Sequence, residues 1–457
     1  MKTGVILQII VFALLAGCNN PQNSTLHQKA ADPESYVKHP QWSKNANIYE
    51  VNIRQYTKEG TFKAFEKHLP RLKKMDVDIL WLMPVFPISE KNRKGTLGSY
   101  YAVKDYKAVN PEFGTMDDLK ELVGKAHNMG FKVILDWVAN HTGWDNAWIT
   151  EHPGWYTKDS TGKMVSPFDW TDVADLNYDN KELWKAMTDA LEFWVKEADV
   201  DGYRCDVAGM VPTEFWNQAR AKLDKIKPVF MLAEAEQPDL QIHAFDMTYA
   251  WELHHIMNQI AKGEANADNI EQYFEKQDTT FPQNAYRMNF ITNHDENSWN
   301  GTVNERMGES AKAFAVLTYT LPGMPLIYSG QETGLNKRLK FFEKDEIEWD
   351  FTSPLIGFYT TLNNMKTNNV ALWNGNYGGR MKRVETTDDK SVFAFIREKD
   401  GNRVFTIVNL TDEQVNVKLK GTGFTGKYAE IFSGDEIEFD SGAGVSLGAW
   451  EYRIYNY

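Results

Sequence analysis

A carboxylic acid stands at or just after the end of several apolar runs that are suited to form buried strands. The four acids in this position are Asp136, Asp206, Glu234 and Asp295. Acids gathered at one place repel one another and are costly to desolvate, so stability alone would not select such an arrangement. Cleavage of a glycosidic bond, in contrast, needs one carboxylate as nucleophile and one protonated carboxylic acid to release the leaving group. If the fold brings these acids together, they are suited to that chemistry.

The elements around these acids alternate between apolar runs and amphipathic stretches. The clearest amphipathic stretch begins at Thr115, repeats apolar residues at helical spacing and ends at Gly130. It leads into the apolar residues 131–135. About eight such strand–helix units are present if a weak one near Phe245 is included. This number favours an α/β fold of the closed (β/α)8 TIM-barrel type over an open doubly wound sheet. No glycine-rich dinucleotide motif follows the first strand, which also disfavours the open sheet.

In a (β/α)8 barrel the functional face lies at the carboxyl ends of the strands, so the four acids are expected to meet on one rim. The predicted strands are residues 48–53, 77–82, 131–135, 202–206, 229–234, 287–292 and 325–328. The predicted helices include residues 61–75, 115–130, 182–195 and 311–320.

The chain is predicted to have four parts. Residues 1–18 form a signal segment and residues 19–43 a flexible polar tether. Residues 44–370 form the barrel, with a small insert at about residues 141–177, after the third strand. Short strands joined by Gly, Asp and Asn turns predict an antiparallel β-sandwich domain over residues 371–457.

The N-terminal segment carries a targeting signal. Lys2 precedes the mostly apolar residues 4–15, which are too few to span a bilayer comfortably, since a span needs about 20 residues. Residues 15–18 (Leu-Ala-Gly-Cys) resemble the bacterial lipobox, in which the chain is cut before the cysteine and the cysteine is acylated. We therefore expect a lipid anchor at Cys18 that holds the protein at the bacterial cell envelope, on the periplasmic or the outer surface. A plain secretory signal is the alternative.

The composition restricts the possible partners. The net charge of −13 disfavours nucleic acid and anionic membrane surfaces as partners and is compatible with a neutral substrate. Two cysteines give no disulfide framework, and Cys205 is expected to be a core thiol that points away from Asp206. Aromatic residues make up 13% of the chain, and they serve either as core or as stacking surfaces for sugar rings.

Four segments resemble those of the α-amylase superfamily, glycoside hydrolase family 13. Residues 136–141 (DWVANH), residues 202–206 (GYRCD), Glu234 and residues 290–295 (FITNHD) occur in the family's order. The resemblance extends over about residues 47–332, and the β domain follows where the family has one. Four matching segments in order are far more specific than any single one.

The resemblance implies a retaining α-glycosidase that hydrolyses α-1,4 bonds in maltooligosaccharides or starch-type glucans. Asp206 would attack the anomeric carbon, Glu234 would act as acid and base, and Asp295 would stabilise the oxocarbenium-like state. The residues expected to bind substrate are Tyr101, His141, Arg204 and His294. Retaining chemistry also places the carboxyl groups of Asp206 and Glu234 about 5–5.5 Å apart.

Neighbouring residues are expected to shift the pKa values of these acids. Arg204 lies two residues before Asp206, on the same strand face, and should lower its pKa and keep it ionised. Glu234 ends an apolar strand, so burial should raise its pKa. Glu236 shares that face and is the rival acid, while Asp136 is expected to orient Arg204 rather than take part in catalysis.

Calcium is a possible cofactor that the chemistry itself does not require. Asn140 and Asp175 resemble ligands of the family's calcium site, and their oxygen atoms suit this ion. The chain departs from typical starch-degrading α-amylases at residues 208–210, which are Ala-Gly-Met where the family has Lys-His. The short insert also argues against a long, deep starch groove.

Two other functions remain open. An α-glucan transglycosylase would use the same site with a sugar hydroxyl in place of water, and Trp299 and Trp137 are the aromatic residues expected to influence that choice. A glucan-binding lipoprotein without catalysis is disfavoured because Asp206, Glu234 and Asp295 are all present.

Overall fold

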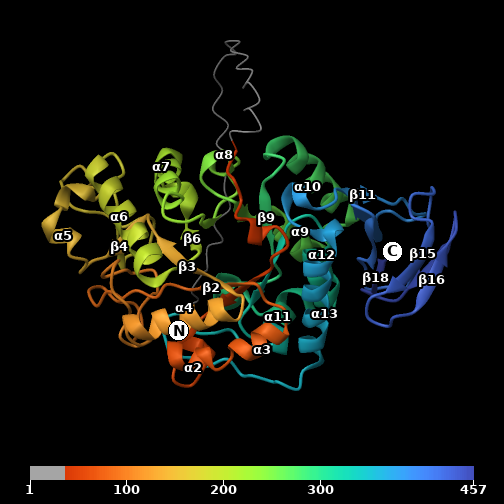
Figure 1. The fold of residues 1–457 in the computed structure, drawn as a ribbon, viewed down its shortest axis with the longest axis horizontal. Helices are drawn as coiled ribbons and strands as arrows, with labels where there is room; N and C mark the ends of the chain where they lie inside the picture. The colour runs from red at the N-terminus through yellow and green to blue at the C-terminus, as the bar shows by residue number, and fades with distance from the viewer. Residues whose placement is uncertain (1–35) are drawn as a thin grey trace, which may run out of the picture. The chain divides into compact units, whose positions relative to one another are not determined.

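The computed structural model describes residues 36–457 (Figure 1). The predicted signal segment, the lipid attachment at Cys18 and most of the predicted tether lie outside the described residues. Within residues 36–457, none of the helices has the length and apolar character needed to cross a membrane.

Eight parallel strands close into a barrel in the order β1-β10-β9-β8-β7-β6-β3-β2, which confirms the predicted fold. The strands are β1 Ile48–Val51, β2 Ile79–Leu82, β3 Lys132–Val138, β6 Gly202–Asp206, β7 Phe230–Ala233, β8 Met247–Tyr249, β9 Tyr286–Asn289 and β10 Met324–Tyr328. The weak unit near Phe245 is thus a real strand, β8. Large apolar side chains such as Trp81, Phe230 and Met288 fill the interior of the barrel, so it is a packed core.

Helices connect the strands. They are α1 Ile53–Tyr56, α2 Phe62–Glu66, α3 Leu69–Lys74, α4 Met116–Asn128, α6 Lys181–Ala198, α7 Thr213–Leu223, α8 Leu240–His243, α9 Trp251–Ala261, α10 Ala267–Thr280, α11 Val303–Met307, α12 Ala311–Thr320 and α13 Pro354–Asn368. Thr115 and Asp118 cap α4 reciprocally, as its sequence predicts. The single helix predicted over residues 61–75 is two helices, because α3 starts anew with Pro70 in its first turn.

The insert after β3 is small. It contains the antiparallel pair β4 His141–Gly143 and β5 Val173–Asp175, with helix α5 Trp148–Glu151 between them. His141 lies opposite Asp175 in this pair, so the insert begins and ends at the same place beside the barrel.

The C-terminal domain is antiparallel, as predicted. Its six-stranded sheet has the order β11-β12-β13-β18-β15-β16, and β14 pairs with β17. The strands are β11 Met381–Arg383, β12 Val392–Lys399, β13 Asn402–Asn409, β14 Val415–Lys418, β15 Gly426–Glu430, β16 Glu436–Phe439, β17 Gly444–Leu447 and β18 Tyr452–Asn456. Phe405, Val417 and Leu447 share one core, which joins the two sheets. This domain is the blue part of Figure 1.

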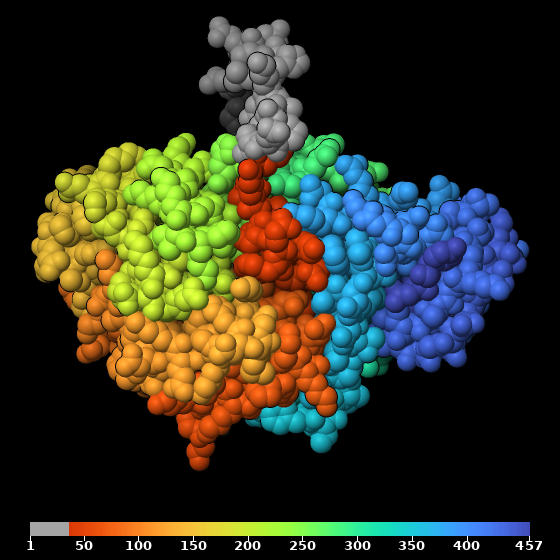
Figure 2. Space-filling model, viewed as in Figure 1, coloured from red at the N-terminus to blue at the C-terminus, as the bar shows by residue number. Residues whose placement is uncertain are grey.

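The predicted tether is wrong for residues 36–43, which pack against the barrel (Figure 2). The ring of His39 lies 2.8 Å from Asp246 and 2.8 Å from the carbonyl oxygen of Asn284. Val37 donates its backbone N–H to Ile242. These partners are about two hundred residues away in sequence, so no local pattern reveals them.

Candidate active site

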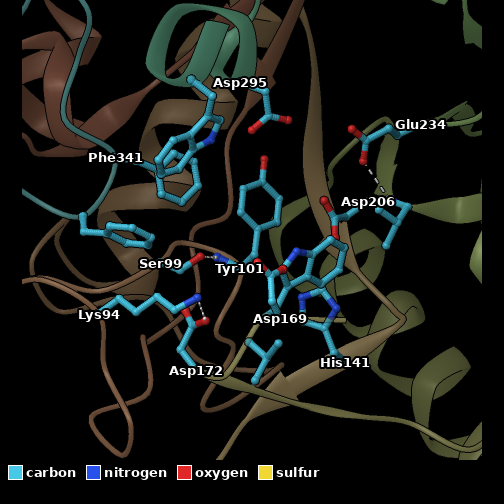
Figure 3. Close-up of a pocket in the computed structure, with 15 residues that line it drawn as sticks. Lys94, Ser99, Tyr101, His141, Asp169, Asp172, Asp206, Glu234, Asp295 and Phe341 are labelled. Carbon is cyan, nitrogen blue, oxygen red and sulfur yellow. Dashed lines mark hydrogen bonds and ion pairs between the residues drawn. The ribbon is translucent and has the colours of Figure 1, made fainter. Parts of the chain in front are cut away.

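A cavity of about 530 Å3 opens at the carboxyl ends of the barrel strands (Figure 3). It is lined by Lys94, Ser99, Tyr101, His141, Asp169, Trp170, Asp172, Val173, Asp206, Val207, Glu234, Asp295, Trp299, Phe341 and Phe342. Three of the four acids singled out in the sequence therefore face one space. The fourth, Asp136, is fully buried on β3.

Arg204 links three of these acids and is itself fully buried. Its Nη1 lies 2.8 Å from Asp136 Oδ1 and 3.0 Å from Asp206 Oδ1, and its Nη2 lies 2.8 Å from Glu234 Oε2. Asp136 and Arg204 are direct partners across β3 and β6, which explains their contact. The predicted role of Asp136 in orienting Arg204 agrees with this geometry. One cation thus neutralises only part of the charge of three carboxylates.

The prediction of a lowered pKa for Asp206 is wrong. Burial raises the pKa of the Asp206 carboxyl well above its ordinary value, Arg204 lowers it, and repulsion from Glu234, Asp136 and Asp295 raises it further. The sequence shows the adjacent guanidinium but not that three acids share it. Arg204 therefore limits the rise in the pKa of Asp206 and does not reverse it.

Glu234 follows the buried apolar strand β7, as predicted, but its carboxylate contacts polar partners. Besides Arg204, its Oε2 accepts a hydrogen bond of 2.8 Å from the backbone N–H of Val207 (Figure 3). Val207 has a left-handed backbone with φ of 36°, which is rare for a β-branched residue. Strain on the order of 1–3 kcal/mol is therefore stored beside Glu234.

The rival acid Glu236 lies elsewhere. It forms an ion pair with Arg287 and accepts a hydrogen bond of 3.1 Å from the backbone N–H of Glu252. It does not line the cavity that Glu234 lines. The geometry therefore favours Glu234 over Glu236 as the acid.

His294 is buried behind the cavity wall and does not line the cavity. Its Nδ1 lies 2.5 Å from Glu50 Oε1, and its Nε2 lies 2.8 Å from the Tyr101 hydroxyl and 3.3 Å from Asp295 Oδ2. Burial alone would lower the pKa of His294, but Asp295 and Glu50 outweigh it and raise the pKa to about 9. A protonated His294 is suited to position Tyr101 and Asp295, so its position does not support the predicted direct contact with substrate.

Tyr101 and His141 both line the cavity, as their predicted role requires. The Tyr101 hydroxyl donates a hydrogen bond of 3.0 Å to Asp136 Oδ2. Burial lowers the pKa of His141 to about 3, so its ring is neutral at pH 7. The ring of His141 lies edge-on to Trp170 at 5.5 Å.

Trp299 and Trp137 differ in position. Trp299 is 49% exposed and lines the cavity. Trp137 is fully buried and packs against Phe86 and Tyr203, so it is a core residue and not an aglycone contact. Alternation along β3 explains this, since Asp136 faces the barrel interior and its neighbour faces outward. Cys205, like Trp137, is a buried core residue, as expected.

Several lining residues escaped the sequence analysis because they lie on loops. They are Lys94 and Ser99 after β2, Asp169, Trp170 and Asp172 in the insert, and Phe341 and Phe342 after β10. Their aromatic members, Trp170 and the pair at residues 341–342, were the local signals available in the sequence.

The calcium prediction concerns Asn140 and Asp175. They lie close together, because Asp175 is opposite His141 across β4 and β5. Within residues 36–457, no group of three or more His, Cys, Asp or Glu side chains is arranged to hold a metal ion. A calcium ion here would depend on backbone carbonyls and water for its other ligands, and calcium stays a prediction.

Two protein-family models match this chain. A family model described as "Alpha amylase, catalytic domain" matches residues 38–160 and 150–398. A second model, "Maltogenic Amylase, C-terminal domain", matches residues 383–454. Among similar chains, Alpha-amylase MalA of Haloarcula japonica is 28% identical over 83% of this chain and 57% of its own length. Alpha-amylase 3 of Dictyoglomus thermophilum is 26% identical over 81% of this chain and 85% of its own.

Two solved structures are similar throughout. The noncanonic maltogenic alpha-amylase AmyB from Thermotoga neapolitana has a TM-score of 0.84 and 29% identity, covering 91% of this chain and 99% of its own. An alpha-amylase from Lactobacillus plantarum has a TM-score of 0.80 and 31% identity, with the same coverage. The catalytic-domain match, the closed barrel and the acids around one cavity lead to one conclusion: this chain belongs to the α-amylase family and is a glycoside hydrolase.

Proposed function

We propose that this protein hydrolyses α-1,4-glucosidic bonds in maltooligosaccharides and starch-type glucans with retention of the anomeric configuration. The observation that carries the proposal is the cavity shared by Asp206, Glu234 and Asp295, with Arg204 in contact with the first two. The names of its relatives, which include alpha-amylases, a maltogenic alpha-amylase and cyclomaltodextrinases, support an α-glucan as substrate.

Each acid has a distinct role in the proposed reaction. The carboxylate of Asp206 attacks the anomeric carbon, while Glu234 protonates the leaving oxygen. Glu234 then removes a proton from water, which releases the sugar from Asp206. Asp295 faces the same space and stabilises positive charge that develops on the ring. Arg204 favours the ionised form of Asp206 that attack requires.

Two further parts of the proposal rest on the sequence. Residues 15–18 support a lipid anchor at Cys18 and a place in the bacterial cell envelope. The oxygen atoms of Asn140 and Asp175 support a calcium ion, which would stiffen the insert and would not act on the bond itself. Transfer to a sugar hydroxyl is the second candidate, because Trp299 lines the cavity with half of its side chain exposed and offers an acceptor sugar a stacking surface.

The role of Glu234 can be tested with two substrates of different leaving-group quality. Glu234→Gln should lower kcat on maltoheptaose about 10³-fold, because an alkoxide leaving group needs protonation. The first turnover of α-maltotriosyl fluoride should be affected far less, since fluoride leaves without a proton. Fluoride release and reducing sugar are measured on the two substrates.

Glu236→Gln is the matched control for this experiment. Because Glu236 pairs with Arg287 outside the cavity, this variant should retain activity within about tenfold on both substrates. Equal losses of activity on both substrates in Glu234→Gln, or a larger loss in Glu236→Gln, would show that Glu234 is not the catalytic acid.

A further inference from the structure

Two loops are joined at the end of the cavity that is far from Glu234. Lys94 lies in the loop after β2, and Asp172 lies in the insert before β5. Lys94 Nζ is 3.1 Å from Asp172 Oδ1, and both residues line the cavity. The Asp172 side chain is only 6% exposed, so Lys94 covers and neutralises a buried carboxylate. Figure 3 shows this pair across the cavity from Glu234, with Tyr101 between them.

The same loop is also joined to the loop after β10. Leu97 donates its backbone N–H to the carbonyl oxygen of Phe342 at 3.0 Å, and Thr96 donates its own to Glu343 Oε1 at 3.0 Å. Gly95 has a φ of 64°, and a Cβ at this position would lie 2.5 Å from Phe342 Cβ. A side chain at this position would therefore force Phe342 and Glu343 to shift, so glycine allows the close approach of the two loops.

We call residues 94–97, together with Asp172, Phe342 and Glu343, the end wall. Its ion pair and its backbone hydrogen bonds fasten three loops to one another. A cavity that continued past this point would have to separate them.

The proposed chemistry fixes which part of a substrate faces the end wall. Glu234 protonates the leaving oxygen, so the reducing-end part of the substrate lies on the Glu234 side of the cleaved bond. A glucose ring carries its anomeric carbon and its 4-hydroxyl at opposite ends. The non-reducing-end part therefore lies on the side of the cleaved bond away from Glu234, and Tyr101 and Lys94 line that side of the cavity (Figure 3).

We propose that the end wall blocks long glucan chains on the non-reducing side, so that the enzyme cleaves near the non-reducing end and releases short products. This inference rests on the proposed function and adds to it the mode of attack. Interior cleavage would require sugar rings to occupy the space that Lys94, Asp172 and Phe342 fill.

A pair of substrates that differ only at the non-reducing end tests this inference. One is p-nitrophenyl α-maltoheptaoside, and the other is the same compound with a 4,6-O-ethylidene cap on its last ring. The uncapped substrate should be cleaved at least about tenfold faster, because the cap adds bulk where the wall stands. In the first minutes the p-nitrophenyl label should remain on long fragments, which chromatography resolves.

The two possible failures are distinguishable. Similar rates on both substrates, with label on fragments of many lengths, would overturn the end-wall inference and leave hydrolysis standing. No cleavage of either substrate would overturn the proposed function itself, and the inference with it.

Variants then test whether the end wall is the reason that the capped substrate is cleaved more slowly. Lys94→Ala combined with Asp172→Ala removes the ion pair together, so no buried charge is left unpaired, and should raise the capped-to-uncapped rate ratio at least about fivefold. Lys91→Ala is the matched control, since Lys91 is exposed in the same loop and does not line the cavity. An unchanged ratio in the double variant, or an equal rise in Lys91→Ala, would show that the end wall does not set the mode of attack.

Discussion

Asp206→Asn should lower kcat on maltoheptaose about 10⁴-fold, a loss of about 5.4 kcal/mol of transition-state stabilisation. An amide of nearly the same size cannot form the glycosyl-enzyme. The fold should survive, because Arg204 retains its contacts with Asp136 and Glu234 and the repulsion among the acids decreases. Initial rates and thermal unfolding of the variant and the wild type test both expectations.

Asp169→Asn is the matched control for this substitution. Asp169 is an exposed carboxylate that lines the same cavity without touching Arg204. Its amide variant should lose less than about tenfold in kcat/KM. Activity near the wild-type level in Asp206→Asn would mean that the nucleophile is another residue.

The largest effect on stability is expected from Arg204→Met. Loss of the guanidinium leaves the buried Asp136 and Asp206 and the partly buried Glu234 without their shared cation. Breaking a buried ion pair by removing one partner costs about 3–5 kcal/mol, and this case leaves three acids. We expect the variant to unfold at clearly lower urea concentration at pH 8 and to be inactive.

The stability loss of Arg204→Met should depend on pH. Burial already raises the pKa of Asp206 and of Asp136, and removal of Arg204 would raise both further. A folded state with a raised carboxyl pKa binds more protons than the unfolded chain, so stability falls as pH rises above the ordinary carboxyl range. The difference between variant and wild type should therefore be smaller at pH 5 than at pH 8.

Arg287→Met provides the comparison, because Arg287 pairs with the single carboxylate of Glu236, whose side chain is 29% exposed. Its stability loss should be clearly smaller. An Arg204→Met variant that matched Arg287→Met at both pH values would contradict the account of Arg204 as the shared cation.

Local sequence patterns were enough to predict the barrel. The sequence of α4 contains its capping residues, its apolar face and its terminal glycine within one short segment. The break between α2 and α3 was missed because apolar spacing continues across it while Pro70 restarts the helix. Residues 36–43 were missed because their partners, Asp246 and Asn284, are distant in sequence.

The acids of the site were predictable for a similar reason. Strand ends meet on one rim of a barrel, so Asp206, Glu234 and Asp295 are brought together by topology alone. The surroundings of the acids were not predictable. Glu50 meets His294 across 244 positions, and Lys94 meets Asp172 through loops whose paths depend on tertiary packing.

The most direct test of the central claim is proton NMR of the first product released from maltoheptaose, read before mutarotation. Attack by Asp206 followed by attack of water inverts the anomeric carbon twice, so the account predicts the α-anomer. An initial β-anomer would show a single inversion and would contradict the covalent role assigned to Asp206.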